Sequence, residues 1–147
     1  MKPPVIEVTN SNPWKIMSSL FGKELHSEAD VLELIEHGIT TASYQLVVAR
    51  LDVPKGAIGA ETTIRNRLKN ANVRLNTEES ERLVGIARVY ASAWSLFGSE
   101  VKALAWMHRP AKYLRDKESV TPMTLAKRHA GVRLLEEALV RTAHGMH

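Results

Sequence analysis

Four polar side chains share one face of a short predicted helix, and their chemistry suits contacts with DNA. The helix is predicted over residues 61–70, where Ile64 and Leu68, four residues apart, face inward. The opposite face carries Thr62, Arg65, Asn66 and Lys69. Side chains of these types contact phosphates and the base edges of a major groove. The pattern predicts a recognition helix, although an ordinary solvent-exposed helix fits the same spacing.

A second predicted helix, over residues 42–51, precedes this one and gives it the frame of a helix-turn-helix. Residues 52–56, Asp-Val-Pro-Lys-Gly, connect the two, because Pro54 interrupts the helical pattern. The candidate DNA-binding residues are Lys55, Thr62, Thr63, Arg65, Asn66 and Lys69.

Recognisable catalytic and metal-binding motifs are missing from the sequence. The chain has no cysteine, which excludes disulfides and thiolate chemistry. It has no Gly-rich phosphate loop, no His-Glu-x-x-His and no Gly-x-Ser-x-Gly. His144 and His147 are three residues apart, but two ligands do not close a structural zinc site. We therefore expect no catalytic residue, no metal and no cofactor, and a protein that is not an enzyme.

The longest predicted helix, over residues 77–97, is the spine of the C-terminal half. Asn76 and Glu79 form a potential capping box at its start, and Gly98 supplies its stop. Its apolar stripe consists of Leu83, Ile86, Ala87, Tyr90, Trp94 and Phe97. We expect Trp94, and also Trp106 of the next helix, to belong to the core.

Capping residues and helix breakers delimit the other elements. Short helices are predicted over residues 13–21, 28–37, 42–51, 61–70, 100–108, 122–131 and 132–144. Residues 1–12 are expected to form a poorly ordered arm, and strand alternation is confined to residues 5–8. The fold class is therefore all-α, with seven or eight short helices.

Basic residues are concentrated in two blocks of a chain whose formal net charge is +4. Residues 48–75 carry six basic against two acidic residues, and residues 101–147 carry nine against four. Such blocks favour an anionic partner such as nucleic acid, although a solvated surface fits them too. No run of apolar residues is long enough to cross a membrane, and residues 1–4 lack an apolar signal core. We expect a cytoplasmic protein with no membrane partner.

Several short motifs follow one another along the last three quarters of the chain. They are Thr63-Ile64-Arg65-Asn66-Arg67, Leu75-Asn76-Thr77-Glu78-Glu79-Ser80-Glu81-Arg82-Leu83, Ala87-Arg88-Val89, Leu96-Phe97-Gly98, Ala105-Trp106-Met107-His108-Arg109-Pro110, Thr121-Pro122-Met123-Thr124-Leu125, Gly131, Leu135-Glu136-Glu137-Ala138-Leu139 and His144-Gly145. From about residue 36 the chain thereby resembles the Xre/MbcA/ParS-type antitoxins of RES–Xre toxin–antitoxin modules. It departs from their pattern in a shorter connection at residues 52–59 and in Met107 and Met123, which replace leucines.

The resemblance implies a type II antitoxin with a division of labour along the chain. Residues 36–75 would form a degenerate Xre-like helix-turn-helix that binds operator DNA as a homodimer and represses the antitoxin's own operon. Residues 76–147 would form a small helical domain that covers the NAD-binding site of a RES-domain toxin, an enzyme that consumes NAD⁺ or uses it for ADP-ribosylation. Residues 1–35 match nothing in this family, and we expect an arm with dimerisation or capping helices there.

Basic and hydrogen-bonding residues of the C-terminal half are the candidates for contact with the toxin, because they suit a site for an anionic dinucleotide. The candidate residues are Arg109, Lys112, Tyr113, Arg115, Arg141, His144 and His147. Tyr113 is expected to be an exposed interface aromatic. Residues 141–147 are expected to form a polar tail that leaves the body at Gly145.

Three questions stay open on the sequence alone. The apolar side chains of the first helix form either a dimer surface or part of the core. They are Trp14, Ile16, Met17, Leu20 and Phe21. A stand-alone helix-turn-helix regulator without a toxin would carry the same DNA-binding face. A domain that has lost DNA binding would fit the short connection at residues 52–59.

Overall fold

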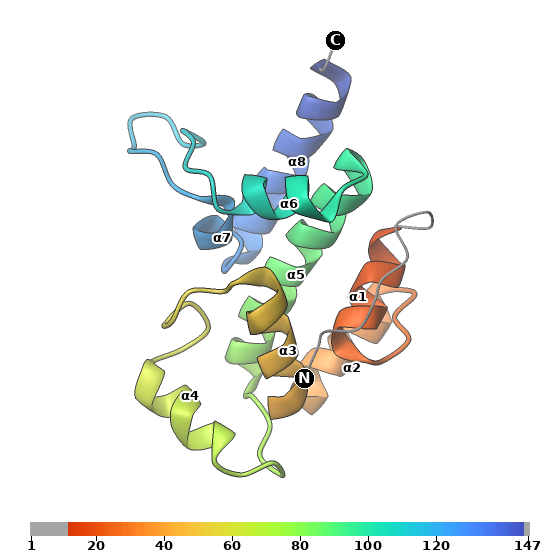
Figure 1. Ribbon diagram of the computed structural model, residues 1–147, viewed down its shortest axis with the longest axis vertical. Coiled ribbons are helices and arrows are strands. Elements are labelled where there is room, and N and C mark those ends of the chain that lie inside the picture. The colour runs from red at the N-terminus through yellow and green to blue at the C-terminus, as the bar shows by residue number, and fades with distance from the viewer. Residues whose placement is uncertain (1–11, 146–147) are drawn as a thin grey trace.

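The computed structural model describes residues 12–145, and within them eight helices form the regular structure (Figure 1). They are α1 (Pro13–Phe21), α2 (Glu28–His37), α3 (Thr41–Leu51), α4 (Glu61–Leu68), α5 (Thr77–Phe97), α6 (Glu100–Met107), α7 (Pro122–Leu125) and α8 (His129–Gly145). Strand-like pairing in these residues is limited to two isolated bridges, Thr40 with Arg74 and Ala111 with Val120. The all-α prediction is confirmed. The predicted arm and the alternation at residues 5–8 fall outside the described residues, apart from Asn12, which caps α1.

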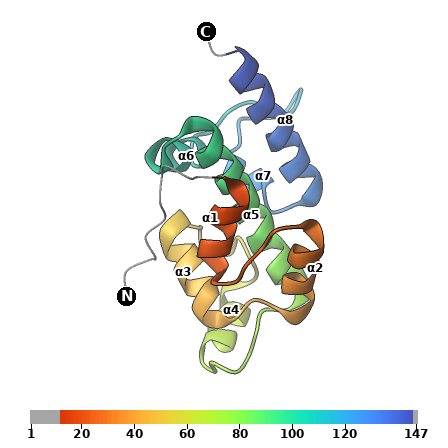
Figure 2. The same ribbon diagram turned by 90° about the vertical axis from the view of Figure 1, so that its right-hand side faces the viewer.

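Helix α5 is the element against which most of the others pack, and Figures 1 and 2 show it running through the middle of the molecule. Its capping box is present: the Asn76 side chain accepts from the Glu79 amide at 2.8 Å, and the Glu79 carboxylate accepts from the Asn76 amide at 2.9 Å. Gly98 ends the helix in the left-handed conformation, with φ of +67°. Helices α1, α2, α3, α6 and α8 all contact it.

The predicted apolar stripe of α5 is buried, apart from its last member. Tyr90 and Trp94 are among the largest fully buried side chains, and their rings meet at a centroid distance of 5.8 Å. Phe97 and Trp106 are only partly buried and pack edge to face at 6.1 Å. Trp94 therefore belongs to the core as predicted, while Trp106 lies at its margin.

The apolar face of α1 belongs to the interior of this chain. Ile16, Met17, Leu20 and Phe21 are buried, and Trp14 packs against the core from its edge. The helix lies against α5 and α3 (Figure 2), so its apolar stripe is already covered by the chain's own helices. A dimer surface formed by these residues is therefore wrong, and they complete the core.

The C-terminal elements differ from the predicted ones because one glycine has another role. Helix α7 has only four residues, and α8 starts at His129, three residues before the predicted start. A Cβ on Gly131 would lie 1.9 Å from the Leu125 carbonyl oxygen, so Gly131 allows the two helices to meet at a sharp corner. It is a close-approach residue inside α8 and does not end the preceding helix.

The ends of two other helices also differ from prediction. Helix α4 ends at Leu68, so Lys69 is its C-cap and Asn70 lies beyond it. Helix α8 continues to Gly145, so residues 141–145 are helical and do not form a tail. Within residues 12–145, no helix combines the length and apolar character that a membrane span requires.

Candidate nucleic-acid interface

Helix α4 presents the predicted DNA-binding side chains to solvent. Ile64 is its one buried residue, at 6% exposure, and Arg67 and Leu68 are half-buried beside it. The six candidates, Lys55, Thr62, Thr63, Arg65, Asn66 and Lys69, are all exposed. Lys55 lies in the preceding loop, with its Nζ 3.9 Å from a carboxylate oxygen of Glu61. The structure therefore brings these candidates together on and around one helix.

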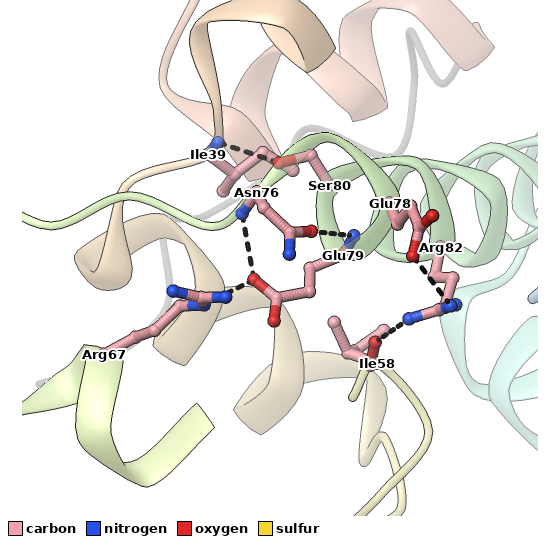
Figure 3. Close-up of polar contacts among 8 residues, drawn as sticks. All are labelled: Ile39, Ile58, Arg67, Asn76, Glu78, Glu79, Ser80 and Arg82. Atoms are coloured by element: carbon pink, nitrogen blue, oxygen red, sulfur yellow. Dashed lines mark hydrogen bonds and ion pairs between the residues drawn. The ribbon is translucent and has the colours of Figure 1, made fainter. Parts of the chain in front are cut away.

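An ion pair at the start of α5 holds α4 in place (Figure 3). Arg67 Nε donates to Glu79 Oε1 at 2.6 Å, and the same oxygen accepts from the Asn76 amide. The Glu79 side chain is only 5% exposed. Partial burial strengthens such a charged hydrogen bond, but it also makes the loss of either partner costly. Few side chains anchor α4 to the body, so this pair carries a large share of its positioning.

The next residues of α5 hold the two loops on either side of α3 (Figure 3). Ser80 is fully buried, and its Oγ accepts from the Ile39 amide at 3.1 Å, just before α3. Arg82 Nη1 donates to the Ile58 carbonyl at 2.7 Å, just before α4. The first residues of α5 therefore fix the segment that leads into α3 and the connection between α3 and α4.

The far end of α3 is joined to the C-terminal helices by a second polar cluster. The Arg50 guanidinium forms two hydrogen bonds with the Glu100 carboxylate, from Nε at 2.9 Å and from Nη2 at 3.2 Å. The buried Tyr90 hydroxyl also donates to Glu100. Burial, and then the hydrogen bond to Glu100, raises the pKa of Tyr90. His108 Nε2 lies 2.9 Å from the Leu51 carbonyl oxygen. Helices α3, α5 and α6 are thus linked by side-chain hydrogen bonds.

Sequence reasoning did not identify Arg67, Ser80 and Arg82 as residues that position the interface. In the sequence these three residues stand out only as members of the short motifs that carry the resemblance. A local signal was available for one partner, because Glu79 already stood in the capping box. The contact of Glu79 with Arg67 joins two different helices, so the helical periodicity of the sequence does not predict it.

The structure places the candidate toxin-binding residues on two separate projections. Arg109, Lys112 and Arg115 are exposed in the segment between α6 and α7, which the bridge of Ala111 with Val120 closes. Arg141 is exposed near the end of α8. Figure 1 shows this segment and the C-terminal end of α8 pointing to different sides of the molecule. The structure therefore does not gather these cations at one point.

The remaining candidates have mixed outcomes. Tyr113 is half-buried and packs against the core, so its prediction as an exposed aromatic is wrong. Burial raises the pKa of its hydroxyl, an effect that Arg109 partly offsets. His144 belongs to the last turn of α8, but its side chain is outside the described part of the chain, as is the whole of His147.

Comparison with known proteins gives one informative similarity. No protein-family model matches the chain. A curated protein named Antitoxin Xre, from Pseudomonas putida, is 30% identical to it over 83 residues. The match covers 56% of this chain and 50% of that protein, so the chain matches about half the length of this relative.

Proposed function

We propose that this protein is the antitoxin of a type II toxin–antitoxin module, with a RES-domain toxin as its partner and its own operator as its DNA target. The observation that carries this proposal is the similarity to Antitoxin Xre over 83 residues. The order of the sequence motifs supports the same family. The proposal assigns no chemistry to the chain itself: it binds a toxin and DNA, and needs no cofactor.

The DNA-binding part of the proposal rests on α4 as a recognition helix. Its exposed hydroxyl, amide and guanidinium groups have the chemistry that reads base edges and phosphates. The Glu79–Arg67 pair and the Arg82–Ile58 bond fix its orientation before any DNA is present. A preorganised helix loses less conformational freedom on binding, which favours affinity.

Substitutions on α4 test this part directly. Arg65→Ala is expected to weaken binding to a duplex from the region upstream of the gene by about 1–3 kcal/mol and to relax base preference at one position. Lys69→Ala is expected to weaken binding to all sequences alike, because a phosphate contact carries no base information. Both effects are measured by fluorescence anisotropy, with Lys15→Ala on the exposed side of α1 as the control. Affinities like that of the unchanged protein for both variants would remove α4 from this role.

The toxin-binding part of the proposal rests on the basic C-terminal half. In a RES-domain toxin the target would be the NAD-binding site, where arginine and lysine suit groups that otherwise bind or flank a dinucleotide. Arg109, Lys112 and Arg115 on one projection and Arg141 on the other are the described candidates. Because these projections point apart, we propose that one of them enters the cofactor site while the other contacts the toxin's surface.

We also propose a homodimer, because one short helix-turn-helix unit offers few base contacts and operators for such units are usually two-fold. The apolar stripe of α1 is buried within the chain, so another surface would have to form the interface. Light scattering at micromolar concentration is expected to give twice the chain mass, and particles of 16.4 kDa alone would exclude the dimer.

A stand-alone transcription regulator is the alternative, and the exposed face of α4 favours it as much as it favours an antitoxin. The two differ in the neighbouring gene, since only the antitoxin requires a RES-domain toxin beside it. A regulator of this kind would bind the same duplex as the antitoxin and would not protect cells from the toxin.

A further inference from the structure

A basic groove runs beside the loop that leads into α4. It has a volume of about 510 Å³ and is lined by residues 56–60 together with three basic side chains. These are Arg82 of α5 and Lys127 and Arg128 of the turn between α7 and α8. In the described part of the chain, no acidic residue lines the groove. Figure 1 shows this turn on the same side of α5 as the loop before α4, so the C-terminal region reaches the edge of the candidate DNA interface.

Two of these three cations have no ion-pair partner among the described residues. Arg82 donates to the Ile58 carbonyl at 2.7 Å and lies 3.7 Å from a carboxylate oxygen of Glu78. Lys127 is half-buried and Arg128 is exposed, and neither forms a salt bridge within residues 12–142. Two cations without a salt bridge among the described residues, placed beside a glycine-containing loop, favour an anionic partner.

Acidic and basic side chains both lie on the other side of the turn. There, Lys127 and Arg128 border a hollow of about 370 Å³ whose lining includes Glu28, Glu81 and Glu136 and also the basic residues Arg88, His129 and Arg133. Glu28 is engaged there by Arg88, whose Nη1 and Nη2 donate to its carboxylate at 2.6 and 2.7 Å. Glu61 and Glu78 do not line the groove: Glu61 lies 3.9 Å from Lys55, and Glu78 lies 3.7 Å from Arg82.

Close packing fixes the turn that carries these cations. A Cβ on Gly85 would lie 2.5 Å from the Ala126 carbonyl oxygen, so only a glycine of α5 lets the turn approach this closely. The Arg128 amide donates to the Leu125 carbonyl at 3.3 Å. The absence of a Cβ at Gly131 lets the first turn of α8 pack against that same carbonyl. The backbone of residues 126–128 is thus held against the helix that also positions α4.

We propose that Lys127 and Arg128 bind the phosphate backbone of DNA beside the groove that α4 enters, which makes the C-terminal region part of the DNA interface. This inference rests on the proposed function of α4. In a helix-turn-helix complex, the first helix crosses the DNA backbone, and the loop after it leads the recognition helix into a major groove about 12 Å wide. Cations next to that loop are placed for phosphates, and such contacts add affinity without base preference.

The test is the salt dependence of binding to a short duplex of random sequence and to a duplex from upstream of the gene. For both probes, Lys127→Ala/Arg128→Ala is expected to reduce the slope of log K against log salt by about 1.8, from about 0.9 per lost phosphate contact. The affinity at low salt is expected to fall roughly tenfold or more, with base preference unchanged. Lys15→Ala/Lys23→Ala is the matched control, because it also removes two exposed cations. Lys15 lies in α1 and Lys23 just after it, and Figure 1 shows α1 across α5 from the turn between α7 and α8.

A charge-preserving variant separates phosphate binding from a folding defect. Lys127→Arg/Arg128→Lys is expected to keep the full slope, whereas the double alanine variant loses part of it. An unchanged slope and affinity in the double alanine variant would overturn this inference and leave the role of α4 intact. Failure of the unchanged protein to bind either duplex would overturn both. An equal loss in the charge-preserving variant would also overturn it, because the effect would then follow from packing and not from charge.

Discussion

Glu79→Ala is expected to lower the free energy of unfolding by about 3 kcal/mol, as measured by urea denaturation. The carboxylate is 5% exposed, and its Oε1 accepts from both the Asn76 amide and the Arg67 guanidinium. Alanine removes the capping box and leaves a half-buried cation without its partner. Glu79→Gln keeps an acceptor but not the charge, so its loss is expected to be intermediate.

The neighbouring Glu78 provides a matched control for this prediction. Its side chain is 81% exposed and pairs with Arg82 one helical turn away, at 3.7 Å. Exposed pairs of this spacing contribute little, so Glu78→Ala is expected to change stability by less than about 0.5 kcal/mol. Equal losses of unfolding free energy in the two alanine variants would show that the contacts of Glu79 with Asn76 and Arg67 do not stabilise the start of α5.

The same substitution is expected to weaken DNA binding, although Glu79 does not face solvent. Without the ion pair, α4 retains Ile64 as its one buried anchor and is held less firmly. Arg67→Ala should weaken binding to the same duplex in a similar way, because it breaks the same contact from the other side. Binding unaffected by either change would mean that α4 does not need this contact to reach the DNA.

Helix positions were predictable from the sequence where both ends carried a local signal. Asn12 and Gly22 delimit α1, and Asn76 and Gly98 delimit α5, through the side-chain caps and left-handed glycines that those residues favour. The exposed face of α4 was likewise predictable, because the four-residue spacing of Ile64 and Leu68 fixed which side chains point outward.

Long-range contacts account for what the sequence could not give. A glycine such as Gly131 is typical of the end of a helix. Its role here is different, because the Leu125 carbonyl oxygen leaves no room for a Cβ at this position. The sequence pattern of the apolar stripe of α1 is the same for a helix that packs on a partner and for one that packs on its own core. The Ser80–Ile39 bond joins residues 41 positions apart, so the positioning of the candidate site depends on contacts that local periodicity does not contain.

The second prediction concerns the C-terminal end of α8. Deleting residues 141–147 is expected to abolish protection against the proposed RES-domain toxin and to leave the fold intact, because it removes only the end of α8 from the exposed Arg141 onward, one of the two basic projections. Leu139, at 3% exposure, is buried just before the deletion, and Arg141 and Thr142 are exposed. Arg141→Ala is expected to reduce protection only partly, because interface energy is shared among a few anchors. Urea denaturation of the purified variants checks that the fold survives.

Full protection by the deletion variant would exclude the end of α8 as the element that blocks the toxin. The segment between α6 and α7, with Arg109, Lys112 and Arg115, would then have to make that contact. Combined alanine substitutions of these three residues in the full chain would test that assignment against the deletion.

Cellular NAD⁺ is the quantity that tests the central claim most directly. It is measured in cells that express the RES-domain toxin that the proposed function places beside this gene, alone or together with the full-length chain. The account predicts that NAD⁺ falls with the toxin alone and stays at the level of toxin-free cells when the chain is co-expressed. An equal fall of NAD⁺ with and without the chain would contradict its function as an antitoxin of a RES-domain toxin.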